Sequence, residues 1–73
     1  MKVIRSINDT GALRCLDIFR RGDGSFGFEE YRRDPEDQSG WYPIGGHAGR
    51  VFPSEAAADA AARAAIAWLD RDI

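Results

Sequence analysis

The chain has 73 residues, of which 44% are apolar and 30% are charged. This length suffices for one domain spanning residues 1–73, with a thin core, and it excludes a second domain. The formal net charge of −2 excludes a whole-molecule attraction to nucleic acid or anionic lipid, so any such binding would need a local basic patch.

The first ten residues, MKVIRSINDT, lack the continuous apolar stretch of a signal peptide. No segment of the chain approaches the roughly 20 apolar residues that span a bilayer. We therefore expect a cytoplasmic protein that does not bind a membrane. Residues 3–7 (VIRSI) leave open whether a weak strand begins the fold.

Residues 12–19 (ALRCLDIF) and 25–31 (SFGFEEY) are rich in β-forming side chains, and a short glycine-bearing loop joins them. This combination predicts a β-hairpin. Apolar side chains occur on both faces of the first run, as expected for a strand in the centre of a sheet. The single cysteine, Cys15, cannot form an internal disulfide, and we expect a buried, unreactive thiol.

The hairpin loop lies within residues 21–27, RGDGSFG. This stretch contains the Arg-Gly-Asp tripeptide of adhesion ligands and the G-x-G-x-x-G spacing of nucleotide-binding loops. A dinucleotide fingerprint needs a helix directly after the glycines, whereas a strand is predicted here, and an adhesion ligand needs an extracellular setting. Glycines also supply the positive φ angles of tight turns. We therefore interpret the stretch as a turn that binds no cofactor.

An acidic loop follows at residues 34–40 (DPEDQSG). Its carboxylates, Asp34, Glu36 and Asp37, lack the alternating spacing of a calcium loop, so we expect a solvated turn instead of a metal site.

Residues 41–52 (WYPIGGHAGRVF) leave two alternatives open, one bent strand or two short strands joined at glycines 45 and 46. Pro43 predicts an edge position. The stretch around His47 lacks the Gly-Lys-Ser/Thr ending of a phosphate loop. No spacing identifies an oriented second group for His47, and one histidine with one cysteine cannot complete a zinc site. We therefore expect neither catalysis nor a metal.

Residues 54–70 predict one uninterrupted helix, because the segment is rich in alanine and begins at Ser54, a good N-cap. Asp59 and Arg63 are spaced to pair on its polar stripe. The expected apolar face consists of Ala57, Ala61, Ala64 and Trp68, flanked by Ala58, Ala62, Ala65 and Leu69. Ile66 falls in the polar stripe, so it is either exposed or covered by the N-terminal segment or by another molecule.

Together these elements predict a two-layer α+β domain, in which a three- to four-stranded antiparallel sheet is packed on one face by a single C-terminal helix. The other sheet face is left free for a partner. The residues that we expect to form a binding surface are Arg14, Arg20, Arg32, Trp41, Tyr42 and Arg50. Arginine beside aromatic side chains suits phosphate, base and protein contacts. Alternatively, Asp17, Glu29 and Glu30 pair with these arginines across the strands.

Two resemblances follow from longer patterns. Three strands followed by an alanine-rich helix, with Arg50-Val51-Phe52 leading into Ser54-Glu55-Ala56-Ala57, resemble the AP2/integrase-type DNA-binding domain over residues 13–69. The resemblance implies a sheet that enters the major groove with the helix behind it. The readout residues of that family do not match position by position, so none is carried over. The block from Gly24 to Asp37 also resembles small bacterial proteins without an assigned activity.

The sequence thus favours a non-enzymatic interaction domain that binds a protein partner or itself, as a homodimer, through the free sheet face. The alternative is weak nucleic-acid binding through the arginines of the sheet, with an affinity that falls steeply with salt.

Overall fold

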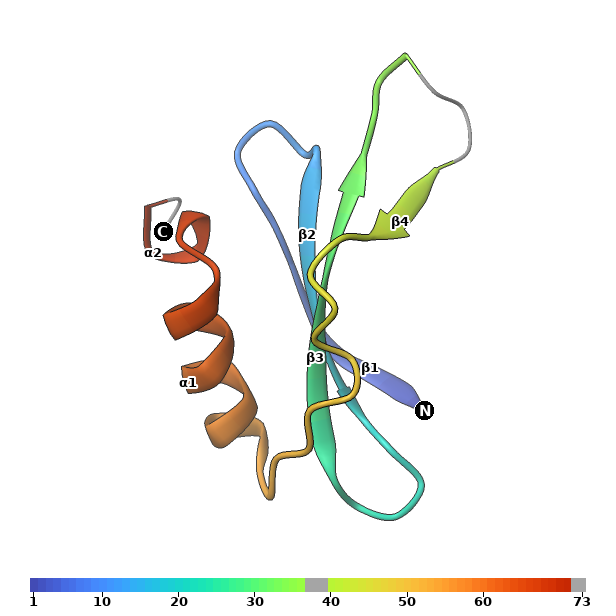
Figure 1. Cartoon of the computed structure of the whole chain (residues 1–73), viewed down its shortest axis with the longest axis vertical. Helices are drawn as coiled ribbons and strands as arrows, with labels where there is room; N and C mark the ends of the chain where they lie inside the picture. Colours follow the sequence, from blue (N-terminus) through green and yellow to red (C-terminus); the bar gives the residue numbers. More distant parts are fainter. Residues whose placement is uncertain (37–39, 72–73) are drawn as a thin grey trace.

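A computed structural model describes residues 1–36 and 40–71 of the chain. Four strands form one antiparallel sheet in the order β1-β2-β3-β4, and two helices follow (Figure 1). The elements are β1 (Lys2–Asn8), β2 (Arg14–Arg20), β3 (Phe26–Arg33), β4 (Trp41–Pro43), α1 (Glu55–Ala65) and α2 (Trp68–Arg71). Because α1 packs on one face of the sheet, the predicted α+β architecture is confirmed, and the N-terminal segment does add a strand.

The β2–β3 hairpin confirms that RGDGSFG is a turn. The Gly24 amide donates to the Arg21 carbonyl at 3.0 Å, and the Arg21 amide donates to the Ser25 carbonyl at 2.8 Å. Gly24 has a φ of +88°, which a side chain would disfavour. The Asp23 carboxylate accepts from the Ser25 amide at 2.9 Å and closes the loop. Local backbone and side-chain bonds therefore account for this stretch.

Arg21 ties the hairpin to a distant part of the chain. Its guanidinium donates to the carbonyls of Phe26, Ala48 and Arg50. It also lies 4.9 Å from the centroid of the Phe19 ring. A Cβ atom at residue 27 would come within 2.8 Å of both Arg21 and Phe19, so glycine is required there. The arginine of the Arg-Gly-Asp tripeptide is thus engaged within the domain.

The core lies between the sheet and α1. Leu16, Ile18 and Phe28 are fully buried on the sheet side. The buried side chains of the C-terminal segment that meet them are Ala58, Ala62, Ile66 and Leu69. Alanines let the helix approach the sheet closely, and larger side chains at the end of the helix fill the remaining volume.

The helical segment corrects the sequence prediction in two respects. Ser54 caps α1 as expected, accepting from the Ala57 amide, but the helix ends at Ala65 and does not continue to residue 70. Ile66 is extended, with φ −119° and ψ 103°, and only 2% exposed. Because the helix ends before Ile66, the Ile66 side chain points into the core. The prediction that Ile66 lies in the polar stripe of the helix is therefore wrong. Trp68 then begins a separate short helix.

The buried row of α1 also differs from the expected one. Ala58 and Ala62 are fully buried, whereas Ala64, expected on the apolar face, is exposed. The pairing of Asp59 with Arg63 is confirmed at 3.1 Å. Since the true core row includes Ile66, the packed face is rotated from the face that an unbroken helix would present.

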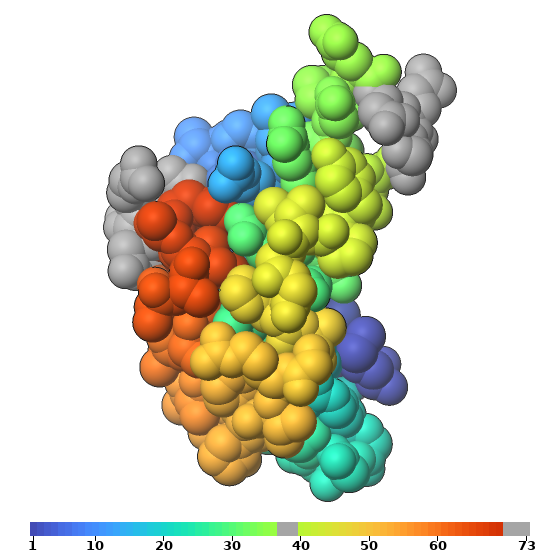
Figure 2. All heavy atoms as spheres, in the orientation of Figure 1, coloured from blue at the N-terminus to red at the C-terminus, as the bar shows by residue number. Residues whose placement is uncertain are grey.

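The segment from residue 41 to 52 pairs with β3 at two separate places. Trp41–Pro43 forms β4 beside the end of β3, and Phe52 makes a single bridge to Phe26 near its beginning. Pro43 therefore does lie on an edge strand, as predicted. Figure 2 shows this segment lying next to α1, with only small patches of the central part of β3 visible between them.

Between these two contacts, a buried carboxylate takes the place of a paired strand. Glu29 is only 3% exposed. It accepts from the backbone amides of Glu30 at 2.8 Å, His47 at 3.3 Å and Ala48 at 3.2 Å. Each of these amides would otherwise lack a partner at the sheet edge, and unpaired buried amides are costly. Glu29 thus holds the loop against β3.

Candidate functional site

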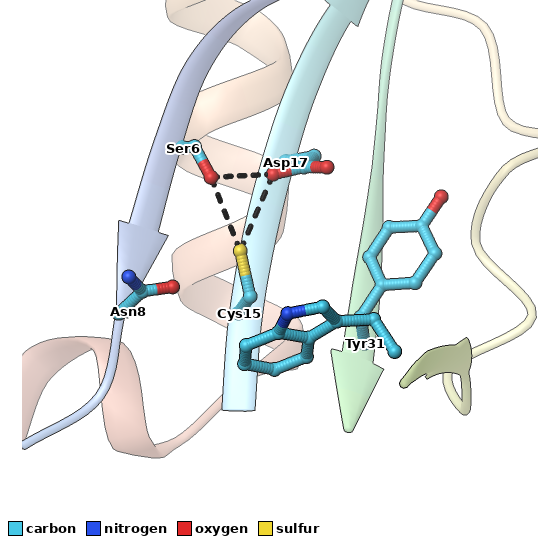
Figure 3. Close-up of a pocket in the computed structure, with 6 residues that line it drawn as sticks. Ser6, Asn8, Cys15, Asp17 and Tyr31 are labelled. Atoms are coloured by element: carbon cyan, nitrogen blue, oxygen red, sulfur yellow. Dashed lines mark hydrogen bonds between the residues drawn. The ribbon is translucent and has the colours of Figure 1, made fainter. Parts of the chain in front are cut away.

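The face of the sheet that α1 leaves free has a pocket of about 380 Å³. We call it the open-face pocket. Its lining residues are Ser6, Asn8, Cys15, Asp17, Tyr31 and Trp41. In Figure 3, Ser6, Cys15 and Asp17 converge from β1 and β2, the Tyr31 side chain lies beside them on β3, and α1 lies beyond the sheet.

Strand alternation and register bring these residues together. Successive side chains of a strand point to opposite faces, and directly paired residues share a face. Leu16 and Ile18 face α1, so Cys15 and Asp17 face the other way. Ser6 of β1 pairs with Asp17 and therefore lies on the same open face.

A triangle of short contacts forms the base of the pocket. The Ser6 hydroxyl donates to Asp17 Oδ1 at 2.7 Å and lies 3.1 Å from Cys15 Sγ. The Cys15 thiol donates to the same carboxylate oxygen at 3.3 Å. Burial raises the pKa of the Cys15 thiol, the Ser6 hydroxyl lowers it, and Asp17 raises it again. A thiol with a raised pKa is a poor nucleophile at neutral pH, which agrees with the expected inert cysteine.

Aromatic side chains complete the pocket. Trp41 is 42% exposed, and the guanidinium of Arg33 lies 5.1 Å from its ring centroid. Burial raises the pKa of Tyr31, and the charges of Asp17 and Glu29 raise it further. Within the part of the chain that the structure describes, no Lys or Arg nitrogen lies within 4.0 Å of Asp17. The pocket therefore combines aromatic surfaces with an anionic group that has no cationic partner there.

The arginines predicted to form a binding surface lie elsewhere. Arg14 and Arg32 are paired in register at one end of the sheet, on the face that packs against α1. Arg14 Nη1 lies 3.8 Å from Glu30 Oε2, and the same oxygen accepts from the Trp68 indole N–H at 2.8 Å. Tyr42 pairs with Arg32 and so belongs to this same face.

The remaining arginines are separated from that pair. Arg20 lies at the opposite end of β2, about 20 Å from Arg14 at about 3.3 Å per residue, and pairs with Lys2. The Arg50 guanidinium lies 5.6 Å from the Phe28 ring centroid and 5.1 Å from that of Phe52. Of the residues predicted for the binding surface, the pocket includes Trp41 alone.

Most of the pocket residues are not among those that the sequence predicts. The sequence predicts Asp17 only as a partner for arginine, and it assigns no role to Ser6, Asn8 or Tyr31. The signal that could have identified Asp17 was its alternation with Leu16 and Ile18, which places it opposite the core. Ser6 and Asn8 could not be placed without the register of β1.

The remaining candidates have structural roles. The His47 ring lies 4.9 Å from Phe28, and its backbone amide donates to Glu29. Among the described residues, no three His, Cys, Asp or Glu side chains gather where they could hold a metal ion. None of the described helices has both the length and the apolar character needed to cross a lipid bilayer. Asp37 lies outside the described residues, whereas Asp34 accepts from the Glu36 amide within the loop.

Comparisons with protein-family models, curated proteins and solved structures gave no match to this chain.

Proposed function

We propose that this protein is a non-enzymatic interaction domain that binds a protein partner through the face of the sheet opposite α1. The observation that supports this proposal is the open-face pocket, which leaves Trp41 42% exposed on a sheet that is covered only on its other side. Tryptophan, tyrosine and arginine dominate the energetics of protein interfaces, and they do so where a partner can exclude water. Trp41, Tyr31 and Arg33 supply these residue types on one face.

The chemistry of the pocket supports binding over catalysis. Cys15 is held as a neutral thiol by burial, and Ser6 has a carboxylate and a thiol as neighbours but no histidine. A nucleophilic hydroxyl needs an adjacent general base with an orienting group. The single free thiol also fits the reducing cytoplasm, where disulfides are rare.

Site-specific photo-crosslinking tests the proposal. A photoreactive residue at the exposed Asn8 position lies on the pocket, and one at the exposed Ala60 position on α1 serves as a matched control. In extract of the source cells, we expect a discrete crosslinked product from position 8 that Trp41→Ser abolishes. Equal products from both positions, or a product that is insensitive to Trp41→Ser, would show that the open face is not the binding surface.

A second copy of the chain is one form that the partner can take. A domain of this size buries only about 60% of its unfolded surface, so dimerisation would add stability. Sedimentation over a range of protein concentrations distinguishes the two forms. A monomer at the highest concentration removes the homodimer and leaves a different protein as the partner.

Weak nucleic-acid binding through Arg14, Arg20, Arg32 and Arg50 remains the alternative. The separation of these arginines and the uncompensated carboxylate on the open face make it the less favoured proposal, since phosphate needs clustered positive charge. A mobility shift with DNA or RNA at low salt, lost as salt rises, would favour this alternative.

A further inference from the structure

The open-face pocket contains the two chemical features that recognise an organic cation. We propose that the protein partner inserts a lysine or arginine side chain into this pocket, where the cation meets the Asp17 carboxylate and the faces of Trp41 and Tyr31. This inference rests on the proposed function and adds to it the chemistry of the partner.

Neutral donors hold the Asp17 carboxylate in place. Its Oδ1 atom accepts from the Ser6 hydroxyl at 2.7 Å and the Cys15 thiol at 3.3 Å, both of which are neutral donors. These bonds fix the orientation of the carboxylate but leave its charge uncompensated. Ionised acceptors form shorter and stronger bonds with cationic donors than with neutral ones. Asp17 is therefore an oriented anion that is accessible from the pocket.

The residue opposite Asp17 in the sheet is also acidic. In the register of β2 and β3, Asp17 pairs directly with Glu29, which lies on the same face. Like charges in opposite positions destabilise a sheet. Glu29 is bonded to backbone amides, and among the described residues neither carboxylate has a cation within 4.0 Å. A cation in the pocket relieves this repulsion, whereas an anion increases it.

The aromatic rings that line the pocket, Tyr31 and Trp41, are suited to contact with a cation. Cations bind over tryptophan and tyrosine faces when they lie within about 6 Å of the ring centroid. The Arg33 guanidinium already does so on Trp41, at 5.1 Å. Arg33 also donates to the Ala12 carbonyl at 3.2 Å, and among the described residues it forms no ion pair with Asp17. The tryptophan thus accepts a guanidinium within the domain, and the adjacent carboxylate still lacks one.

The test is a titration of the whole protein, labelled with nitrogen-15, with N-acetyl-arginine amide. N-acetyl-citrulline amide, which has nearly the same shape but no charge, is the matched ligand. The two indole N–H signals serve as reporters, because Trp41 lines the pocket and Trp68 lies on the other face, bonded to Glu30. We expect the arginine compound to shift the Trp41 signal saturably, with millimolar affinity, and to leave the Trp68 signal in place.

Protein variants assign the effect to Asp17. Asp17→Asn keeps an oxygen that can accept from Ser6 and Cys15 but removes the charge, so we expect affinity for the arginine compound to fall at least about fivefold, as for the loss of one hydrogen bond between charged groups. Glu55→Gln removes one charge on the helix layer and should not change the affinity. Equal shifts with arginine and citrulline compounds, or unchanged affinity in Asp17→Asn, would overturn the inference.

The two proposals can fail separately. If crosslinking from position 8 depends on Trp41 but the titration shows no preference for the charged compound, the interaction face stands and the cationic side chain is wrong. If the crosslinked product disappears in Asp17→Asn and persists in Glu55→Gln, both are supported.

Discussion

Replacing Arg21 should destabilise the domain far more than replacing the arginine next to it. Arg21→Ala removes hydrogen bonds to the carbonyls of Phe26, Ala48 and Arg50 and the contact with the Phe19 ring. It thereby disconnects the β2–β3 turn from the loop that leads to α1.

The expected loss follows from these contacts. A hydrogen bond contributes about 0.5–1.5 kcal/mol net, and a surface cation–π contact adds about 0.5–1 kcal/mol. Because two of the three bonds are solvent-exposed, we expect a loss of about 2–3 kcal/mol in the free energy of unfolding. For a domain of 60–100 residues, this corresponds to a melting temperature about 10–20 °C lower. Such a loss is a large part of the stability that a small core provides.

Urea and thermal unfolding, followed by circular dichroism, measure the effect. The control is Arg20→Ala, since Arg20 is exposed and lies opposite Lys2, so its removal should be neutral or slightly stabilising. Arg21→Lys keeps the charge but loses the planar fork, and it should lose most of the same stability. A difference below about 0.5 kcal/mol between Arg21→Ala and Arg20→Ala, the scatter of ordinary surface substitutions, would refute the reasoning.

Three further outcomes are expected. Asp17→Asn should leave the urea midpoint unchanged or raise it, because it removes repulsion with Glu29; a lower midpoint would show that the carboxylate has a structural role. Ile66→Ala should cost about 2–4 kcal/mol as a core truncation, and no loss relative to Ala64→Ser would place Ile66 outside the core. Burial raises the pKa of Cys15 above 9.0, so the folded state binds the thiol proton more tightly than the unfolded state does. This contribution to stability is complete below pH 9 and is lost as the pH rises through the folded pKa; urea midpoints should therefore fall less above pH 9 in Cys15→Ala than in the natural chain.

Local signals predicted the hairpin and the beginning of the helix. The turn at residues 21–27 contains the glycines that it needs and is closed by the bond from the Ser25 amide to the Asp23 carboxylate. Ser54 caps α1 by accepting from the Ala57 amide with its hydroxyl. Both features depend on residues a few positions apart, so the sequence contains all the information needed. The edge position of Pro43 was predictable for the same reason, because proline has no backbone N–H to donate to a neighbouring strand.

The end of α1 could not be predicted in this way. Alanine-rich sequence favours a continuing helix, and Ile66 leaves it because the core accommodates its side chain in an extended backbone. Tertiary packing thus overrides intrinsic propensity. The Glu29 bonds to residues 47 and 48 are equally non-local.

That the arginines of the sheet form a binding surface stays a prediction, but the strand register places Arg14 and Arg32 on the face of the sheet that α1 covers. Arg14 and Arg20 alternate in phase with Leu16 and Ile18, which identifies their row as the one facing the helix. Long side chains at strand ends reach water from such a row, so they belong to the margin of the core. Asp17, in the other row, indicated the open face.

The Glu29 carboxylate also determines how this sheet can grow. An outer strand with free amides and carbonyls is a template for adding further chains. On one side, the amide of residue 30 is bonded to Glu29, and β4 has only three residues and ends in proline. On the other side, β1 presents seven residues. The β4 side of the sheet is therefore poorly suited to pairing with a further strand, whereas β1 presents a longer edge.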